Sequence, residues 1–244
     1  MSLVTFHEAA DLYKLARRPV VRKHLVTHGA CKSFSLALSQ LERRLGDLAV
    51  DDSWRSLLFA LKSFRFEMTA APVPFNCPEI QRVSPEQLEL RFRACERSYP
   101  QFAPELGALK SMYAQLRKVS DNPMGAAMKK ILTGKAGSTV AVVVKESRLL
   151  APTEEALTGL DAKIEVVVPQ QLRAPRCYDQ LIVIGPARWF SNAEYIVRAP
   201  RAATIDIVQF RWIADDWTLS PAFTGSSLPG PRIVSEVPAD PVPP

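Results

Sequence analysis

Three nearly unbroken apolar runs decide the fold of this chain: TVAVVVK (139–145), KIEVVVP (163–169) and DQLIVIG (179–185). Such runs are typical of strands buried on both faces, as in a parallel sheet covered by helices. A fourth segment, RAATIDIVQFRW (201–212), alternates apolar and polar residues, which favours a strand at the edge of the sheet. Short connectors separate the strands, so we expect an α/β fold: a helical N-terminal region followed by a small, mostly parallel, doubly wound sheet.

The residues before these strands carry helix signals. Pro19 and Gly29 bound the segment PVVRKHLVTHG and predict a short helix there. Ser53 is a candidate N-cap for a long apolar helix, and Ser84 followed by Pro85 is a strong start signal for another. In all, about seven helices are predicted before the first strand. The predicted domains are a helical domain at 1–120, an α/β domain at 121–227 and a proline-rich tail at 228–244.

The tail holds six prolines in its 17 residues. Because proline cannot donate a backbone hydrogen bond, we expect neither helix nor strand there, and interpret the tail as a linker, an extended arm or a strap over a neighbour.

Composition excludes several classes of protein. The chain is 47% hydrophobic and 23% charged, and no apolar run approaches the roughly 18 residues of a membrane span. The N-terminus lacks the order of charges, apolar block and cleavage site of a signal peptide, so we expect a cytoplasmic protein without membrane contact. Its four cysteines are widely separated, which argues against a zinc site and against disulfides.

Positive charge gathers in the first half of the chain. Residues 1–120 hold 18 Lys and Arg against 12 Asp and Glu, whereas the remaining residues balance. The densest stretch contains Lys14, Arg17, Arg18, Arg22 and Lys23 with no acid between them. Such a cluster can neutralise the phosphates of a nucleic acid. The alternatives are a solvated basic helix face or a docking face for an acidic partner protein.

A second group of candidates follows the predicted strands. Ligands of open α/β sheets bind outside the carboxyl ends of the strands. Cations and an aromatic residue there could hold a nucleic-acid backbone with stacking; the alternative is an ordinary polar rim. The residues at these ends are Lys145, Ser147, Arg148, Gln170, Gln171, Arg188, Trp189 and Asn192.

Motifs for catalysis are missing from the sequence. Gly134-Lys135 precedes a strand, whereas a phosphate loop follows one. Gly185 stands in no G-x-G-x-x-G pattern, and His24 and His28 lack the glutamate of a metalloprotease helix. Asp179 is more typical of a group that binds backbone amides than of a base. We therefore expect no catalytic residue, no metal and no cofactor.

The run NPMGAAMKKILTGKAGSTVAVVVKESRLLAPTEEAL (122–157) resembles the opening of the second RecA-like lobe of superfamily 2 helicases. KIEVVVPQQL (163–172) and YDQLIVIGPARWF (178–190) are similar to the strands that follow in that lobe. The resemblance covers residues 122–213, and some anti-phage defence proteins, including a DISARM-type component, carry lobes of this kind.

The sequence also departs from the pattern of that family. Arg198 and Arg201 stand near the place of the helicase arginine finger, but the Gln-x-x-Gly-Arg pattern is absent, and the first lobe with its phosphate loop is missing. Phosphoryl transfer needs amides, lysine and metal around the phosphates at once. The resemblance therefore implies a degenerate lobe kept as a scaffold.

These observations favour a non-catalytic, nucleic-acid-associated module that binds DNA or RNA and a protein partner within a larger assembly. One alternative is a protein–protein scaffold or adaptor without nucleic-acid contact, and another is an enzyme of a doubly wound class with an unrecognised site. The predicted nucleic-acid-binding residues are Lys14, Arg17, Arg18, Arg22, Lys23, Arg148, Arg188, Trp189, Arg198 and Arg201.

Overall fold

The computed structural model describes residues 20–174, 176–190, 196, 201–213 and 232–236. The chain divides into two compact units. An α/β unit is formed by residues 1–27, 70–72 and 123–244, and a helical unit by residues 28–69 and 73–122. In the sequence, the helical unit is therefore an insertion that follows the first strand of the α/β unit.

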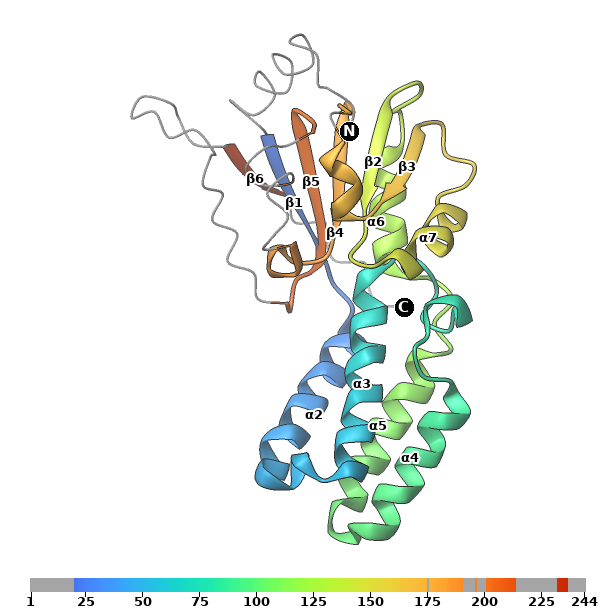
Figure 1. Ribbon diagram of the computed structural model, residues 1–244, viewed down its shortest axis with the longest axis vertical. Coiled ribbons are helices and arrows are strands. Elements are labelled where there is room, and N and C mark those ends of the chain that lie inside the picture. Colours follow the sequence, from blue (N-terminus) through green and yellow to red (C-terminus); the bar gives the residue numbers. More distant parts are fainter. Residues whose placement is uncertain (1–19, 175, 191–195, 197–200, 214–231, 237–244) are drawn as a thin grey trace, which may run out of the picture. The chain divides into compact units, whose positions relative to one another are not determined.

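A six-stranded sheet with all strands parallel forms the centre of the α/β unit (Figure 1). The strand order is β3-β2-β4-β5-β1-β6. This arrangement confirms the α/β class and the parallel sheet. The strands are β1 (Val20–Val26), β2 (Thr139–Val143), β3 (Lys163–Val167), β4 (Gln180–Ile184), β5 (Thr204–Phe210) and β6 (Arg232–Glu236).

Helical segments cover the sheet. Helix α6 (Pro123–Leu132) contacts β5 and β1, and α7 (Leu150–Ala156) contacts β3. Alternate residues of five strands, among them Val21, Val183 and Ile207, join one buried apolar cluster. The short 3-10 helices η5 (Pro169–Arg173) and η6 (Ala187–Phe190) close this cluster with Leu172 and Phe190. Apolar residues at every second position of a strand are what a covered sheet face requires.

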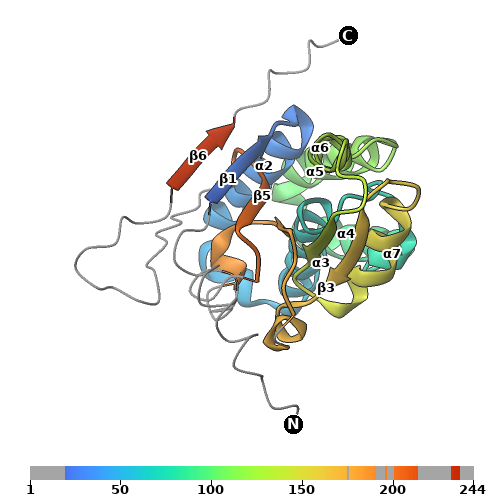
Figure 2. The same cartoon turned by 90° about the horizontal axis from the view of Figure 1, so that it is seen from above.

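Residues 20–26 correct the predicted helix at 19–29. They form β1, paired with β5 on one side and with β6 on the other (Figure 2). Valines at positions 20, 21 and 26 explain the difference, because β-branched side chains favour strands. The sheet therefore begins before the helices, and the helical unit starts at His28 rather than near residue 1.

Two further expectations about strands were wrong. Strand β5 lies inside the sheet between β4 and β1, and all of its residues except Thr204 are buried. Its polar residues Asp206 and Gln209 create the alternating pattern that is typical of an edge strand. The edge strand β6 comes instead from the proline-rich tail, because residues 232–236 (RIVSE) contain no proline and can pair with β1.

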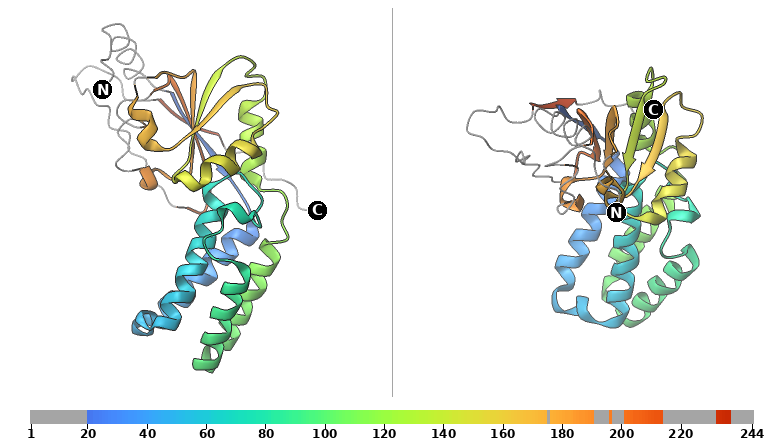
Figure 3. Two further views of the ribbon diagram at one scale, coloured as in Figure 1. Left: turned by 45° about the vertical axis from the view of Figure 1, so that its right-hand side comes forward. Right: turned by 45° about the horizontal axis from the view of Figure 1, so that its top comes forward.

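Four longer helices form the helical unit, and they run alongside one another in both views of Figure 3. They are α2 (Gly29–Leu45), α3 (Asp52–Ala70), α4 (Pro85–Ser98) and α5 (Ala103–Leu116), with η1 (Gly46–Val50), η2 (Pro78–Ile80) and η3 (Pro100–Phe102) between them. Ser84 caps α4 as predicted, its hydroxyl accepting a hydrogen bond from the backbone of Gln87. No helix in the described ranges is long and apolar enough to span a membrane.

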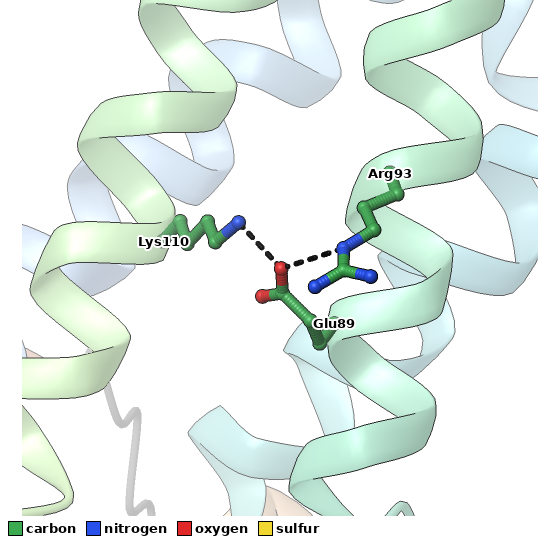
Figure 4. Close-up of polar contacts among 3 residues, drawn as sticks. All are labelled: Glu89, Arg93 and Lys110. Carbon is green, nitrogen blue, oxygen red and sulfur yellow. Dashed lines mark hydrogen bonds and ion pairs between the residues drawn. The ribbon is translucent and has the colours of Figure 1, made fainter.

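An ion-pair cluster joins α4 to α5 on the surface of the helical unit. The carboxylate of Glu89 accepts hydrogen bonds from Lys110 Nζ at 2.7 Å and from Arg93 Nε at 3.1 Å (Figure 4). The bond to Lys110, followed by that to Arg93, holds the pKa of Glu89 below its ordinary value.

Candidate nucleic-acid interface

The carboxyl ends of β2 and β4 form the topological switch point of the sheet. Strand β2 leads to β3 on one side, whereas its neighbour β4 leads to β5 on the other. The two connections diverge, and in open α/β sheets ligands bind in the crevice that such divergence opens. Lys145, Glu146 and Arg148 follow β2, and Arg188 and Trp189 follow β4. The structure thus gathers at one edge four of the residues singled out in the sequence.

Lys145 ties the two strand ends together. Its ammonium group donates a hydrogen bond to the backbone carbonyl of Trp189 and lies 5.8 Å from the centroid of the Phe190 ring. The backbone N–H of Trp189 in turn donates to the carbonyl of Pro186, which closes the turn after β4. Lys145 therefore orients this turn as well as placing a positive charge beside it.

Gly185 allows Trp189 to fold back onto the strand end. It adopts φ +105°, a region that side chains rarely enter. A Cβ atom at this position would lie 2.3 Å from Cε3 of Trp189. The indole is half-buried and packs against the apolar cluster of the sheet. Gly185 thus allows the Trp189 ring to approach the backbone closely. It is not the glycine of a phosphate loop.

Arg148 is paired with an acid from its own turn. Its Nε donates to Glu146 Oε2 at 2.8 Å, and the two side chains are 26% and 29% exposed. Arg188, in contrast, is exposed on η6. We name Lys145, Arg148, Arg188 and Trp189 the carboxyl-edge surface. This surface holds three cations and one half-buried aromatic ring.

Polar neighbours extend this edge. Ser147 lies in η4 (Ser147–Leu149) after β2, and Gln170 and Gln171 lie in η5 after β3; all three are exposed. The amide oxygen of Gln171 accepts a hydrogen bond from the backbone of Val168 at 2.8 Å, so it supports its own turn. Asn192 lies outside the described residues.

The basic cluster near the N-terminus is not one helix face. Lys14, Arg17 and Arg18 lie outside the described residues. Arg22 and Lys23 are successive residues of β1, so their side chains leave the strand on opposite faces. Both are half-buried. The alternative of a basic helix face is therefore wrong for these two residues, because they lie in a strand, while their contact with nucleic acid stays a prediction.

Arg201 lies at the opposite edge of the sheet. It precedes β5, and its backbone carbonyl accepts a hydrogen bond from Tyr178, which precedes β4. Its side chain is buried, and its Nε donates to the carbonyl of Leu172 at 3.0 Å. Because its side chain is buried, Arg201 does not contribute an exposed charge to the carboxyl-edge surface. Arg198 lies outside the described residues.

Asp179 has the backbone-binding role that the sequence predicted. Its Oδ2 accepts hydrogen bonds from the backbone N–H of Thr139 at 2.7 Å and from the Thr139 hydroxyl at 2.8 Å. These two bonds hold the pKa of Asp179 below its ordinary value. The carboxylate joins the starts of β2 and β4, again at the amino edge.

A buried polar chain across three strands was missed from the sequence. Asp206 on β5 is fully buried; its Oδ1 lies 2.7 Å from His24 Nε2 on β1, and its Oδ2 accepts a hydrogen bond from Gln180 Nε2 on β4 at 2.5 Å. Polar residues inside the apolar segments DQLIVIG and TIDIVQF were the available signal. His24 offers no such signal, because the sequence around it predicts a helix.

The described residues offer no metal cluster, and Cys31 is a poor candidate for thiol chemistry. Among those residues, no group of three or more His, Cys, Asp or Glu side chains could hold a metal ion. No disulfide joins the four cysteines, and burial raises the pKa of Cys31 to about 12. A thiol with such a pKa is protonated at neutral pH and is a poor nucleophile.

Comparison of the chain with models of protein families, with curated proteins and with solved structures gave no match. The resemblance of residues 122–213 to a helicase lobe therefore stays a prediction. Function has to be inferred from the chemistry of the carboxyl-edge surface and its place in the fold.

Proposed function

We propose that this chain is a non-catalytic nucleic-acid-binding module that works in a larger assembly, and that it contacts the sugar-phosphate backbone through the carboxyl-edge surface. One observation carries the proposal: Lys145, Arg148 and Arg188 come together with Trp189 at the switch point of the sheet. This is where parallel α/β sheets bind their ligands.

The chemistry of these side chains suits a polyanion. Arginine presents a planar fork of donors that matches phosphate oxygens, and lysine adds a point charge. Each phosphate contact releases condensed counterions, so several weak contacts add up to useful affinity. Glu146 forms an ion pair with Arg148, one of these three cations.

Trp189 adds an aromatic surface that is only partly exposed. One part of the indole lies against Gly185 and the apolar cluster, so the ring is held in place before any ligand arrives. Bases of a single strand stack on such rings with little dependence on sequence. We therefore favour a single strand over a duplex, whose bases are already stacked.

A degenerate helicase lobe fits this proposal. Residues 122–213, which resemble the second RecA-like lobe, supply the strands β2, β3, β4 and β5. A lobe that retains its strand-end contacts can still hold a nucleic acid without hydrolysing ATP. A role in bacterial anti-phage defence belongs to the same proposal, because the resemblance extends to proteins of that kind.

The test is a mobility shift of short single-stranded DNA and RNA with purified protein at low and at high salt. We expect a shift at low salt that weakens steeply as salt is added. The absence of any shift at low salt would contradict the proposal. Turnover of ATP by the pure protein would contradict its non-catalytic part.

A second candidate function rests on the helical unit. Several large apolar side chains are exposed there, among them Val50 at 77%, Leu90 at 63% and Phe59 at 51%. Exposed apolar side chains can mark contact with another protein, although single ones are common on any surface. If the chain is a protein–protein adaptor, the wild type should bind its partner protein at any salt concentration. The variants F59S and L90S should lose that binding.

A further inference from the structure

The ion pair between Glu146 and Arg148 has a chemical consequence for the carboxyl-edge surface. Arginine binds a phosphate best through two neighbouring N–H groups of its guanidinium. In this structure Nε, which belongs to one such pair of donors, is already bound to the carboxylate of Glu146 at 2.8 Å. A phosphate that approaches this side of Arg148 has to displace that carboxylate.

The geometry points to Glu146 as an internal competitor: we propose that its carboxylate occupies the phosphate-binding side of Arg148 and thereby keeps the affinity of the carboxyl-edge surface for nucleic acid low. This inference rests on the proposed function and adds a regulatory element to it. The ligand is the phosphodiester backbone of a single strand.

Three features make Glu146 suited to this role. It lies two residues from Arg148 in the same turn, so the carboxylate is always near the guanidinium. Both side chains are about three-quarters buried, so water screens their attraction less than at an open surface. Each side chain also keeps about a quarter of its surface exposed, so the pair is not sealed from solvent.

Competition of this kind has a predictable size. A partly exposed ion pair contributes at most about 1 kcal/mol, which corresponds to roughly fivefold in affinity. Without the negative charge of Glu146, the positive charge of Arg148 can neutralise one more phosphate. The plot of log affinity against log salt should then steepen by about 0.7 for a single strand.

The experiment measures fluorescence anisotropy of labelled oligodeoxythymidylate and oligouridylate with the full chain. Glu146→Gln removes the charge and keeps the shape of the side chain. Glu154→Gln is the matched control, because Glu154 is an exposed glutamate on α7 of the same unit. Each variant is also prepared in an Arg148→Gln background. Thermal unfolding of all variants checks that they are folded.

We expect roughly fivefold tighter binding for E146Q, a change below twofold for E154Q, and no gain from E146Q in the R148Q background. A gain that persists without Arg148 would overturn the inference, because it would be a general effect of charge. Wild-type binding that E146Q leaves unchanged or weakens would overturn it too, while the proposed function stands. If neither wild type nor E146Q binds at low salt, the proposed function itself is wrong, and the inference with it.

Discussion

His24 Nε2 lies 2.7 Å from Asp206 Oδ1, so a buried contact joins two strands that are 182 residues apart in the sequence. Strand β1 precedes the whole helical unit, and β5 follows it. Together with Gln180, the contact fixes β4, β5 and β1 to one another beyond their backbone ladder. The polar chain is thus a specific link between the N-terminal strand and the rest of the sheet.

Asp206→Ala should lower the free energy of unfolding of the α/β unit by about 3–5 kcal/mol. The substitution leaves the buried polar groups of His24 and Gln180 without the carboxylate between them. Urea unfolding followed by circular dichroism measures the loss. Asp161→Ala, at an exposed position, is the matched control and should stay within about 0.5 kcal/mol of wild type. A loss below about 1 kcal/mol for Asp206→Ala would contradict a structural role for this link.

Much of the architecture could be predicted because it lies in local patterns. The apolar runs predicted β2, β3 and β4, and the cap at Ser84 predicted the start of α4. Strand β1 could not be predicted in this way. Pro19 and Gly29 look like helix boundaries, while the pairing that makes 20–26 a strand comes from β5 and β6, far away in the sequence.

The candidate site, too, could be predicted only in part from the sequence. Lys145, Arg148, Arg188 and Trp189 were predicted because each directly follows an apolar strand. The ion pair between Glu146 and Arg148 was not predicted, because the order of charged residues in a sequence does not show which of them pair in the fold. The burial of Arg201 was missed for a similar reason: its partner, the carbonyl of Leu172, belongs to another connection.

Val21→Asp tests β1 as an interior strand. Val21 has no exposed surface and belongs to the apolar cluster of the sheet. An unpaired carboxylate there should abolish cooperative unfolding of the α/β unit or lower its stability by several kcal/mol, at least about 3. Val50→Asp, at a position 77% exposed, makes the same chemical change on the surface and should be nearly neutral. Equal thermal stability of the two variants would refute the placement of β1.

Gly185→Ala should destabilise the turn after β4. Its backbone has φ +105°, and the added Cβ would meet the Trp189 ring at 2.3 Å. We expect a cost on the order of 2 kcal/mol and weaker binding of oligonucleotides, because the ring has to move. Gly107→Ala, in α5 with open space around it, should instead stabilise by about 1 kcal/mol. An unchanged midpoint of thermal unfolding for Gly185→Ala would rule out the close approach.

Glu89→Gln tests the ion pairs between α4 and α5. The pKa of Glu89 is lowered by its bonds to Lys110 and Arg93, so the ionised form stabilises the fold above the ordinary glutamate pKa of about 4.3. The contribution is lost as pH falls through the lowered pKa. Because the side chain is a third exposed, we expect at most about 1 kcal/mol at pH 7, measured by urea unfolding. If the difference in free energy of unfolding between E89Q and wild type stayed constant down to about pH 2, it would contradict a stabilising role of the ion pairs.

The most direct test of nucleic-acid binding at the carboxyl edge compares two charge reversals by anisotropy with a labelled single strand at low salt. Arg188→Glu alters the carboxyl-edge surface, and Lys163→Glu alters an exposed lysine at the start of β3, on the amino edge of the same sheet. We predict salt-dependent binding by wild type, a loss of roughly tenfold for Arg188→Glu and less than about threefold for Lys163→Glu. Equal losses for the two variants, or no binding by wild type, would contradict the account.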